Sequence, residues 1–161
     1  MAQVNTSPDN HLRAVSDLTP QLDISVSNAE GSAIILVVER DPHIRELESY
    51  FLNEAGFTVD FAADGLDALT RARELRPDII ITEVLVPKLD GLALCRTVKS
   101  DPDLQHIVML VFSILAVQSR AREAGADAFL MKPLAEKRLV ETVRQLLVMR
   151  RAMSQPEKTH D

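Results

Sequence analysis

The sequence predicts an α/β fold, a doubly wound five-stranded parallel sheet with helices on both faces. Between residues 33 and 150, short apolar runs alternate with amphipathic segments five times. This alternation is typical of strands joined by crossover helices. The first run, AIILVV at residues 33–38, contains no polar residue, which indicates a strand buried on both faces of the sheet.

The first half of this region predicts a strand at 33–38 and a helix after it. Asp41 can cap that helix and Pro42 can stand at its first position. Gly56 ends the helix. The remaining segments of this half are a strand at 57–61, a helix at 66–75 and a strand at 79–81.

The second half repeats the alternation. A loop at 86–91 leads to a helix with Leu92, Cys95 and Val98 on one side. The segments that follow are a strand at 107–112, a short helix at 117–123, a strand at 128–131, and a last helix with apolar residues on one side at Leu139, Val143, Leu146 and Leu147.

The ends of the chain differ from this middle region in composition. Residues 1–32 are rich in Ser, Asn, Asp, Thr and Pro, too polar to offset the entropy of ordering. We predict a flexible N-terminal tail at 1–32, with a partner-binding segment as the alternative. The domain then covers 33–150, and a flexible C-terminal tail covers 151–161.

Composition narrows the class of protein. A length of 161 residues suits one domain with a real core. The net charge of −6 argues against nucleic acid as a partner. The N-terminus has no basic start followed by an apolar run, and no stretch is apolar enough to span a bilayer. We therefore expect a cytoplasmic protein with no membrane partner.

The ends of the predicted strands carry charged residues and one hydroxyl. In parallel sheets the ligand site lies beyond the carboxyl ends of the strands. The residues that follow strands one, three, four and five are Glu39, Arg40, Asp41, Glu83, Ser113 and Lys132. We predict that they form the working site.

Four stretches and the last amphipathic helix carry a family resemblance. The stretches are ILVVERDPHIRELESYFLNEAGFTV, DGLDAL, RPDIIITEVLVPKLDGLALC and EAGADAFLMKP. Together they resemble the receiver domain of bacterial two-component response regulators, the CheY-like family. The resemblance implies a flavodoxin-like sheet of order 2-1-3-4-5. It also implies phosphoryl transfer from a kinase histidine to an aspartate after strand three, beside a divalent metal held by acids after strand one.

The sequence departs from that family pattern at two positions. Glu83 stands at the phosphoacceptor position, where the family has aspartate. Glu39 matches the first acid after strand one, but Arg40 replaces the second, which is a metal ligand in the family. Asp41 resembles a helix cap more than a ligand.

Other positions keep the family pattern. Ser113 matches the hydroxyl residue and Lys132 the lysine, which in the family both bind phosphoryl oxygens. Phe129 stands at the position of the aromatic switch residue, with a plain core residue as the alternative.

The net charge of the predicted site suggests why metal-dependent phosphorylation would be lost. Glu39, Arg40, Glu83 and Lys132 together carry no net charge, so a divalent cation has nothing to balance. We expect Arg40 to pair with Glu83, with a solvent-facing arm as the alternative. Metal-dependent phosphorylation should then be lost, and Glu83 either mimics a phosphorylated aspartate or is a solvated or lysine-paired relic.

The resulting hypothesis is a stand-alone pseudo-receiver that signals by phosphorylation-independent protein contacts. It would be no enzyme, with no catalytic residue, metal or cofactor, and a monomer or weak homodimer. Its partners would be proteins such as a histidine kinase, contacted through residues 117–123, 128–131 and 136–150. The alternative is a functional response regulator phosphorylated unconventionally by a histidine kinase. An FMN carrier is rejected because the turn at 39–43 offers no phosphate cradle.

Overall fold

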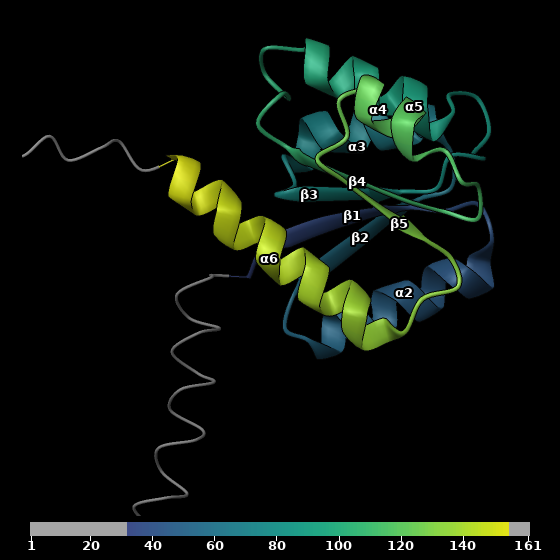
Figure 1. Ribbon diagram of the computed structural model, residues 1–161, viewed down its shortest axis with the longest axis vertical. Coiled ribbons are helices and arrows are strands. Elements are labelled where there is room, and N and C mark those ends of the chain that lie inside the picture. Colours follow the sequence, from purple (N-terminus) through teal and green to yellow (C-terminus); the bar gives the residue numbers. More distant parts are fainter. Residues whose placement is uncertain (1–31, 155–161) are drawn as a thin grey trace, which may run out of the picture. The chain divides into compact units, whose positions relative to one another are not determined.

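The fold was obtained as a computed structural model that describes residues 32–154. Its five strands are all parallel and run in the order β2-β1-β3-β4-β5. The predicted fold class and strand order are confirmed. Helices α3, α4 and α5 cover one face of the sheet, and α2 and α6 cover the other (Figure 1).

The elements follow the predicted alternation, with ends shifted by a residue at several places. Their bounds are β1 Ile34–Val38, α2 Pro42–Glu54, β2 Thr58–Ala62, α3 Gly65–Leu75, β3 Ile79–Thr82, α4 Gly91–Ser100, β4 Val108–Ser113, α5 Gln118–Glu123, β5 Ala128–Met131 and α6 Glu136–Ser154.

The predicted tails fall mostly outside the described residues. Residues 1–31 and 155–161 lie beyond them, so the tail prediction applies to parts of the chain that the structure does not describe. Helix α6 continues to Ser154, past the expected domain end at residue 150. None of the described helices combines the length and hydropathy needed to cross a membrane.

Aspartate caps begin the helices that carry the site loops. The Asp41 carboxylate accepts hydrogen bonds from the amides of His43 and Ile44, and Pro42 occupies the first turn of α2. Asp90 caps α4 in the same way, through the amides of Leu92 and Ala93. These caps satisfy amides that have no partner within the helix, so the helices start close to the strand ends.

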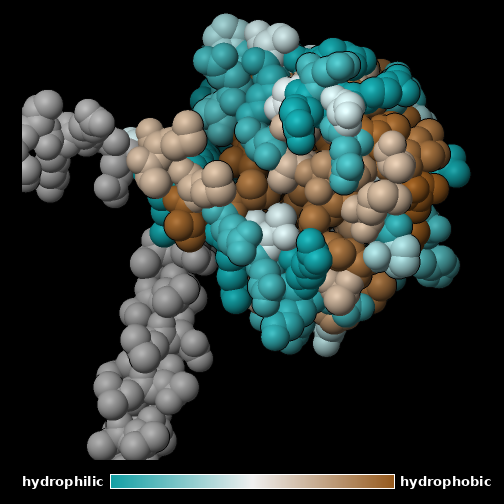
Figure 2. All heavy atoms as spheres, viewed as in Figure 1, coloured by the Kyte–Doolittle hydropathy of each residue, from teal (hydrophilic) through white to brown (hydrophobic). Residues whose placement is uncertain are grey.

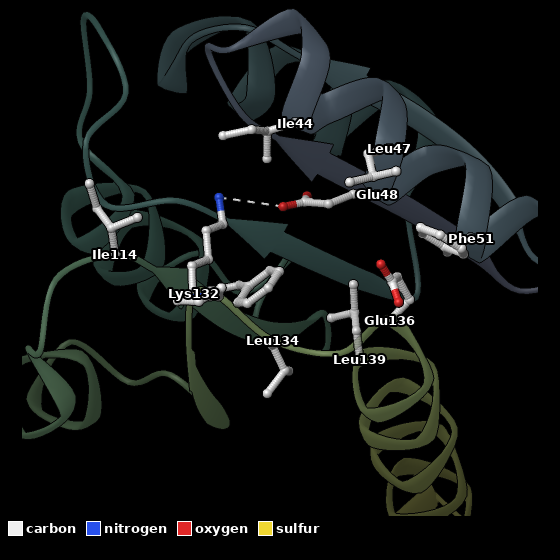
Figure 3. Close-up of a pocket in the computed structure, with 11 residues that line it drawn as sticks. Ile44, Leu47, Glu48, Phe51, Ile114, Lys132, Leu134, Glu136 and Leu139 are labelled. Carbon is white, nitrogen blue, oxygen red and sulfur yellow. Dashed lines mark ion pairs between the residues drawn. The ribbon is translucent and has the colours of Figure 1, made fainter.

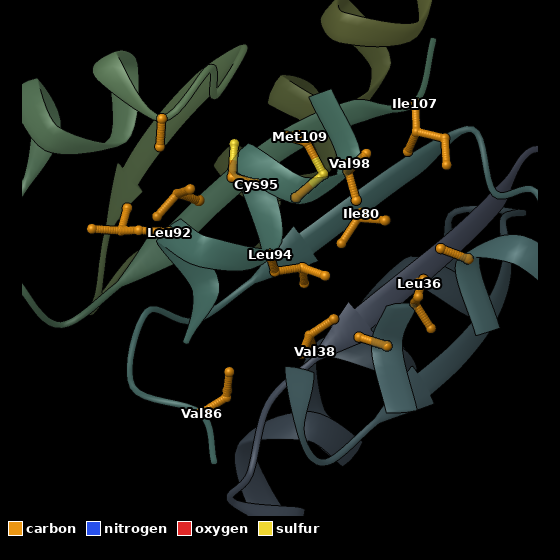
Figure 4. Close-up of a cluster of buried hydrophobic side chains, with 14 of the residues drawn as sticks. Leu36, Val38, Ile80, Val86, Leu92, Leu94, Cys95, Val98, Ile107 and Met109 are labelled. Atoms are coloured by element: carbon orange, nitrogen blue, oxygen red, sulfur yellow. The ribbon is translucent and has the colours of Figure 1, made fainter. Parts of the chain in front are cut away.

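The core lies in two layers, one on each side of the sheet. On one side, Leu36, Ile80 and Met109 of the strands pack against α4 residues such as Leu94 and Cys95 (Figure 4). On the other side, Ile35, Ile79 and Leu110 pack against Leu52 of α2 and Leu139, Val143 and Leu147 of α6. Each strand alternates between these two layers, as the pleat of a sheet requires.

The strand register brings the predicted site residues together. Val38 is paired with Thr82, and Thr82 with Val111, so Glu39 and Glu83 leave adjacent strands side by side. The Lys132 amide donates to the Ser113 carbonyl at 2.9 Å, which continues the β4–β5 pairing past the end of the strand. Hydrophobic residues gather on the right of Figure 2, where Figure 1 shows the carboxyl ends of the strands.

Candidate functional site

Lys132 lies at the centre of the charged cluster. Its Nζ is 2.6 Å from Glu39 Oε2, 3.3 Å from Glu83 Oε2 and 3.4 Å from Glu48 Oε1. Burial works against the charged amine, but the hydrogen bond to Glu39 and the three carboxylate charges outweigh it and raise the pKa of Lys132. Lys132 therefore stays an ammonium ion at neutral pH.

Glu83 is surrounded by hydrogen-bond donors. Its Oε1 accepts from the Ser113 hydroxyl and from the Val84 amide at 2.7 Å. Its Oε2 accepts from the Ile114 amide at 3.2 Å and faces Lys132. The residue is 6% exposed. A buried carboxylate with donors on both oxygens is held in one orientation.

Gly91 supports the backbone of Glu83. Its amide donates to the Val84 carbonyl at 2.9 Å, and a Cβ at this position would collide with the Glu83 carbonyl. The start of α4 can approach the end of β3 this closely only because residue 91 has no side chain.

Glu39 and Asp41 have different roles: Glu39 belongs to the charged cluster and Asp41 caps α2. Glu39 Oε2 pairs with Lys132, and its Oε1 accepts from the Asp41 amide at 3.0 Å. The Asp41 side chain points into the first turn of α2, so its predicted role as a helix cap is confirmed.

Arg40 does not join the cluster, and the expected ion pair with Glu83 is wrong. Arg40 is exposed, and within residues 32–154 no ion pair connects it to an acid. Lys132 already meets Glu83, and burial of a second cation would add a desolvation cost of several kcal/mol. The guanidinium group therefore stays in solvent, which was the alternative interpretation.

Glu48 belongs to the cluster, and the sequence analysis missed it. It lies in α2, is 7% exposed, and its Oε1 forms an ion pair with Lys132 without a hydrogen bond. Burial, and secondly the charges of Glu39 and Glu83, raise its pKa to about 7, while Lys132 opposes the rise. The sequence did contain a pattern that could have identified Glu48. Ile44, Glu48 and Leu52 follow one another at four-residue spacing, which places an acid on the core-facing side of the helix.

Glu48 changes the charge of the site. With Arg40 outside and Glu48 inside, three carboxylates surround one ammonium group. The cluster carries two negative charges when all three acids are ionised, rather than none.

Comparison with known proteins agrees with the fold. Residues 35–144 match the response regulator receiver domain. The chain belongs to this family. A receiver domain of a signal transduction histidine kinase from Syntrophus aciditrophicus has 34% identity and a TM-score of 0.70, over 80% of this chain and 98% of that one. The chemotaxis regulator CheY4 of Vibrio cholerae has 28% identity and a TM-score of 0.68, over 72% and 99%.

Curated relatives of this receiver domain are longer proteins. The DNA-binding response regulator MtrA of Mycolicibacterium smegmatis is 34% identical over 113 residues, 70% of this chain and 50% of MtrA. The response regulator MprA of Mycobacterium ulcerans is 38% identical over 117 residues, 72% of this chain and 50% of MprA. The chain spans about half the length of these relatives, so stand-alone function stays a prediction.

The exclusion of nucleic acid must be corrected. It rested on the net charge of −6, but relatives named MtrA are DNA-binding response regulators. The charge of a chain that matches half of such a protein does not report what the whole protein binds. Net charge was the wrong criterion here.

The divalent metal that the family resemblance implies does not fit the described side chains. Glu39 and Glu83 direct their oxygens to Lys132, Ser113 and backbone amides, and Asp41 caps α2. Among residues 32–154 no group of three or more His, Cys, Asp or Glu is arranged to hold a metal ion. The cluster has charge to attract a cation, but its oxygens already have donors.

Phe129 lies in β5 and is half-buried against the core layer of α3, α4 and α5. This position suits a core residue and leaves part of the ring accessible. Its role as a switch stays a prediction.

Proposed function

We propose that this receiver domain signals through protein contacts without accepting a phosphoryl group, with the Glu83 carboxylate in the place of a phosphorylated aspartate. The observation that carries the proposal is the donor set around Glu83. The Ser113 hydroxyl, the Ile114 amide and Lys132 all face its two oxygens. In the family, the hydroxyl and the lysine are the groups that bind phosphoryl oxygens.

The same contacts argue against Glu83 as a nucleophile. A carboxylate attacks phosphorus through a free lone pair, and a cation must neutralise the incoming phosphoryl group. Both Glu83 oxygens already accept hydrogen bonds. Attack would require those contacts to break inside a buried site, and each costs about 1–3 kcal/mol. The domain would then have no enzyme activity of its own.

A functional receiver phosphorylated by a histidine kinase is the second candidate. One observation favours it: the buried cluster holds three carboxylates and one ammonium group, a charge that a divalent cation could balance. Relatives such as MtrA and MprA are named as response regulators. Rearrangement of Glu48 and Glu83 would have to precede metal binding.

The output surface that we propose is formed by α5, β5 and α6, the usual contact surface in the family. A partner on this surface would sense how Glu83 holds Ser113 and Lys132, because these residues end β4 and follow β5. From the relatives named DNA-binding, we carry over the proposal that the output regulates a DNA-binding activity. The site of action would be the cytoplasm.

Phosphodonor treatment separates the two candidates. The chain is incubated with acetyl phosphate and Mg²⁺, and intact mass is measured. We expect no added phosphate on the unaltered chain and none on Glu83→Gln. Added phosphate on the unaltered chain that Glu83→Gln abolishes would establish the second candidate instead.

An NMR comparison tests the proposed mimicry. Glu83→Gln removes the anion but keeps the shape, so amide shifts should change at Val84 and Ile114 and extend to β5. The control is Glu74→Gln, which removes an exposed carboxylate on α3 and should change only local signals. If the Glu83→Gln changes stay within the loop after β3, Glu83 does not set the output surface.

A further inference from the structure

A pocket lies between α2 and the start of α6. Its volume is about 450 Å³, within the range of small-molecule sites. The walls are mostly apolar and come from α2, β4 and the segment that leads into α6 (Figure 3). The apolar side chains on these walls include Ile44, Leu47, Phe51, Phe112, Leu134 and Leu139.

Glu48 is the unusual member of this lining. Its side chain is 8% exposed, and its Oε1 accepts no hydrogen bond from any described residue. Figure 3 shows the Glu48 carboxylate and the Lys132 ammonium group pointing toward one another. Buried carboxylate oxygens normally accept hydrogen bonds. Glu48 therefore lines the pocket with an ion pair to Lys132 but no hydrogen bond within residues 32–154, so a ligand in the pocket can supply the hydrogen-bond donor that the carboxylate lacks.

The charge around the pocket selects the kind of donor. Lys132 is closer to Glu39 and Glu83 than to Glu48, so its positive charge is already shared between two other acids. The cluster keeps a negative excess that a cation would balance. A ligand group that both donates a hydrogen bond to Glu48 and balances this charge is a second cation with N–H groups.

The apolar walls of the pocket indicate what the uncharged part of the ligand should be. Phe51 and Phe112 offer ring surfaces, and Leu134 and Leu139 offer aliphatic ones. Such walls exclude a fully hydrated ion, because its water would lose hydrogen bonds on entry. They suit a compact aromatic or aliphatic body.

We propose that this pocket binds a primary ammonium group on a compact apolar body, with the ammonium group donating to the Glu48 carboxylate. The body lies between α2 and the start of α6, against Phe51 and Leu139. This site requires no phosphoryl chemistry, so it stands or falls independently of the proposed function. The ammonium group belongs either to a free amine or to a lysine side chain of a protein partner.

The probe for a free amine is phenethylamine, titrated into the full chain at pH 8, where the Glu48 carboxyl is ionised. Binding is followed by methyl NMR signals of Ile44, Leu47 and Leu139. We expect saturable shifts at millimolar concentrations, and a dissociation constant about tenfold or more higher for phenethyl alcohol, which has the same body without the charge.

Two matched variants test the assignment to Glu48. Glu48→Gln keeps the shape and removes the charge, and should weaken phenethylamine about tenfold or more. Glu136→Gln removes an exposed carboxylate at the rim of the same pocket and should change affinity less than about threefold. Equal affinity of the unaltered chain for amine and alcohol overturns the proposal even if Glu48→Gln does not fold.

A lysine derivative separates the two sources. Nα-acetyl-lysine methylamide is titrated in the same way. Tighter binding of this compound than of phenethylamine, with the same loss in Glu48→Gln, assigns the site to a protein lysine, and the reverse order assigns it to a free amine. Absence of saturable shifts with both compounds, or shifts that Glu48→Gln leaves unchanged, would refute the ammonium site.

Discussion

The two faces of the sheet bury titratable groups in different ways. On the face covered by α3, α4 and α5, the core layer contains Cys95, and burial raises the pKa of its thiol to about 11. On the face covered by α2 and α6, Glu48 occupies a core-facing position with a pKa of about 7. Cys95 is neutral at physiological pH, whereas Glu48 is near its titration midpoint.

Lys132 explains the difference. It follows β5 and lies under α2, so a carboxylate on that face has a cation within 3.4 Å. Without such a partner, a buried carboxylate would cost several kcal/mol. The α2 face therefore accepts an acid, and a pocket lies beside it, while on the other face Leu94 of α4 is fully buried.

Removal of the Lys132 ammonium group should have the largest effect on the free energy of unfolding. Lys132→Met leaves Glu39, Glu48 and Glu83 without a cation, and should lower the free energy of unfolding by about 4 kcal/mol at pH 8. The loss should be smaller at pH 5, where protonation relieves the repulsion. Urea denaturation measures both values, with the exposed Lys137→Met as control. A loss below about 1 kcal/mol would mean that Lys132 does not hold the cluster together.

The second largest loss of stability should come from a substitution that creates a cavity beneath α4. Leu94→Ala should cost about 3.5 kcal/mol, because a fully buried leucine leaves a void that its neighbours fill only in part. Leu47→Ala on α2 should cost less than about 1 kcal/mol, since that side chain is 52% exposed. Similar losses in urea denaturation of the two variants would contradict the contrast between the faces.

The pH dependence of stability should change when Glu48 is replaced. The pKa of Glu48 rises from 4.5 to about 7 on folding, so its contribution to stability is present below pH 4.5 and is lost as pH rises through 7. Between these values the unaltered chain should lose about 3 kcal/mol relative to Glu48→Gln.

Unfolding free energies at four or five pH values between 4.5 and 8 measure this difference. Glu46→Gln, on the exposed side of the same helix, is the control and should keep a constant offset. A constant offset for Glu48→Gln as well would show that Glu48 titrates normally.

Arg40 should have the smallest effect. Arg40→Ala removes an exposed side chain outside the cluster and should change the free energy of unfolding by less than about 0.5 kcal/mol. Thermal and urea denaturation at low and high salt would detect a hidden ion pair. A salt-dependent loss of more than about 1 kcal/mol in the free energy of unfolding would mean that Arg40 does form an ion pair in the cluster.

The sequence predicted most of the site because strand ends are readable from local pattern. Glu39, Glu83, Ser113 and Lys132 each follow an apolar run, and the edge of a parallel sheet gathers the ends of its strands. Arg40 was expected beside Glu83, because it stands at the position of a metal ligand in the family. The direction in which a side chain leaves the backbone follows a regular period in helices and strands. Arg40 lies in a turn, where no such period exists, so its direction depends on the packing around it.

Residue types and their spacing were enough to determine the parallel sheet, its strand order through the family resemblance, the helix cap at Asp41 and the strand-end residues. These depend on periods of two and 3.6 residues and on local hydrogen bonds. Only the tertiary structure decided that Glu48 shares Lys132 and that Arg40 does not. Glu48 and Lys132 are distant in sequence, and the free energy of a charge depends on its three-dimensional neighbours and its access to water.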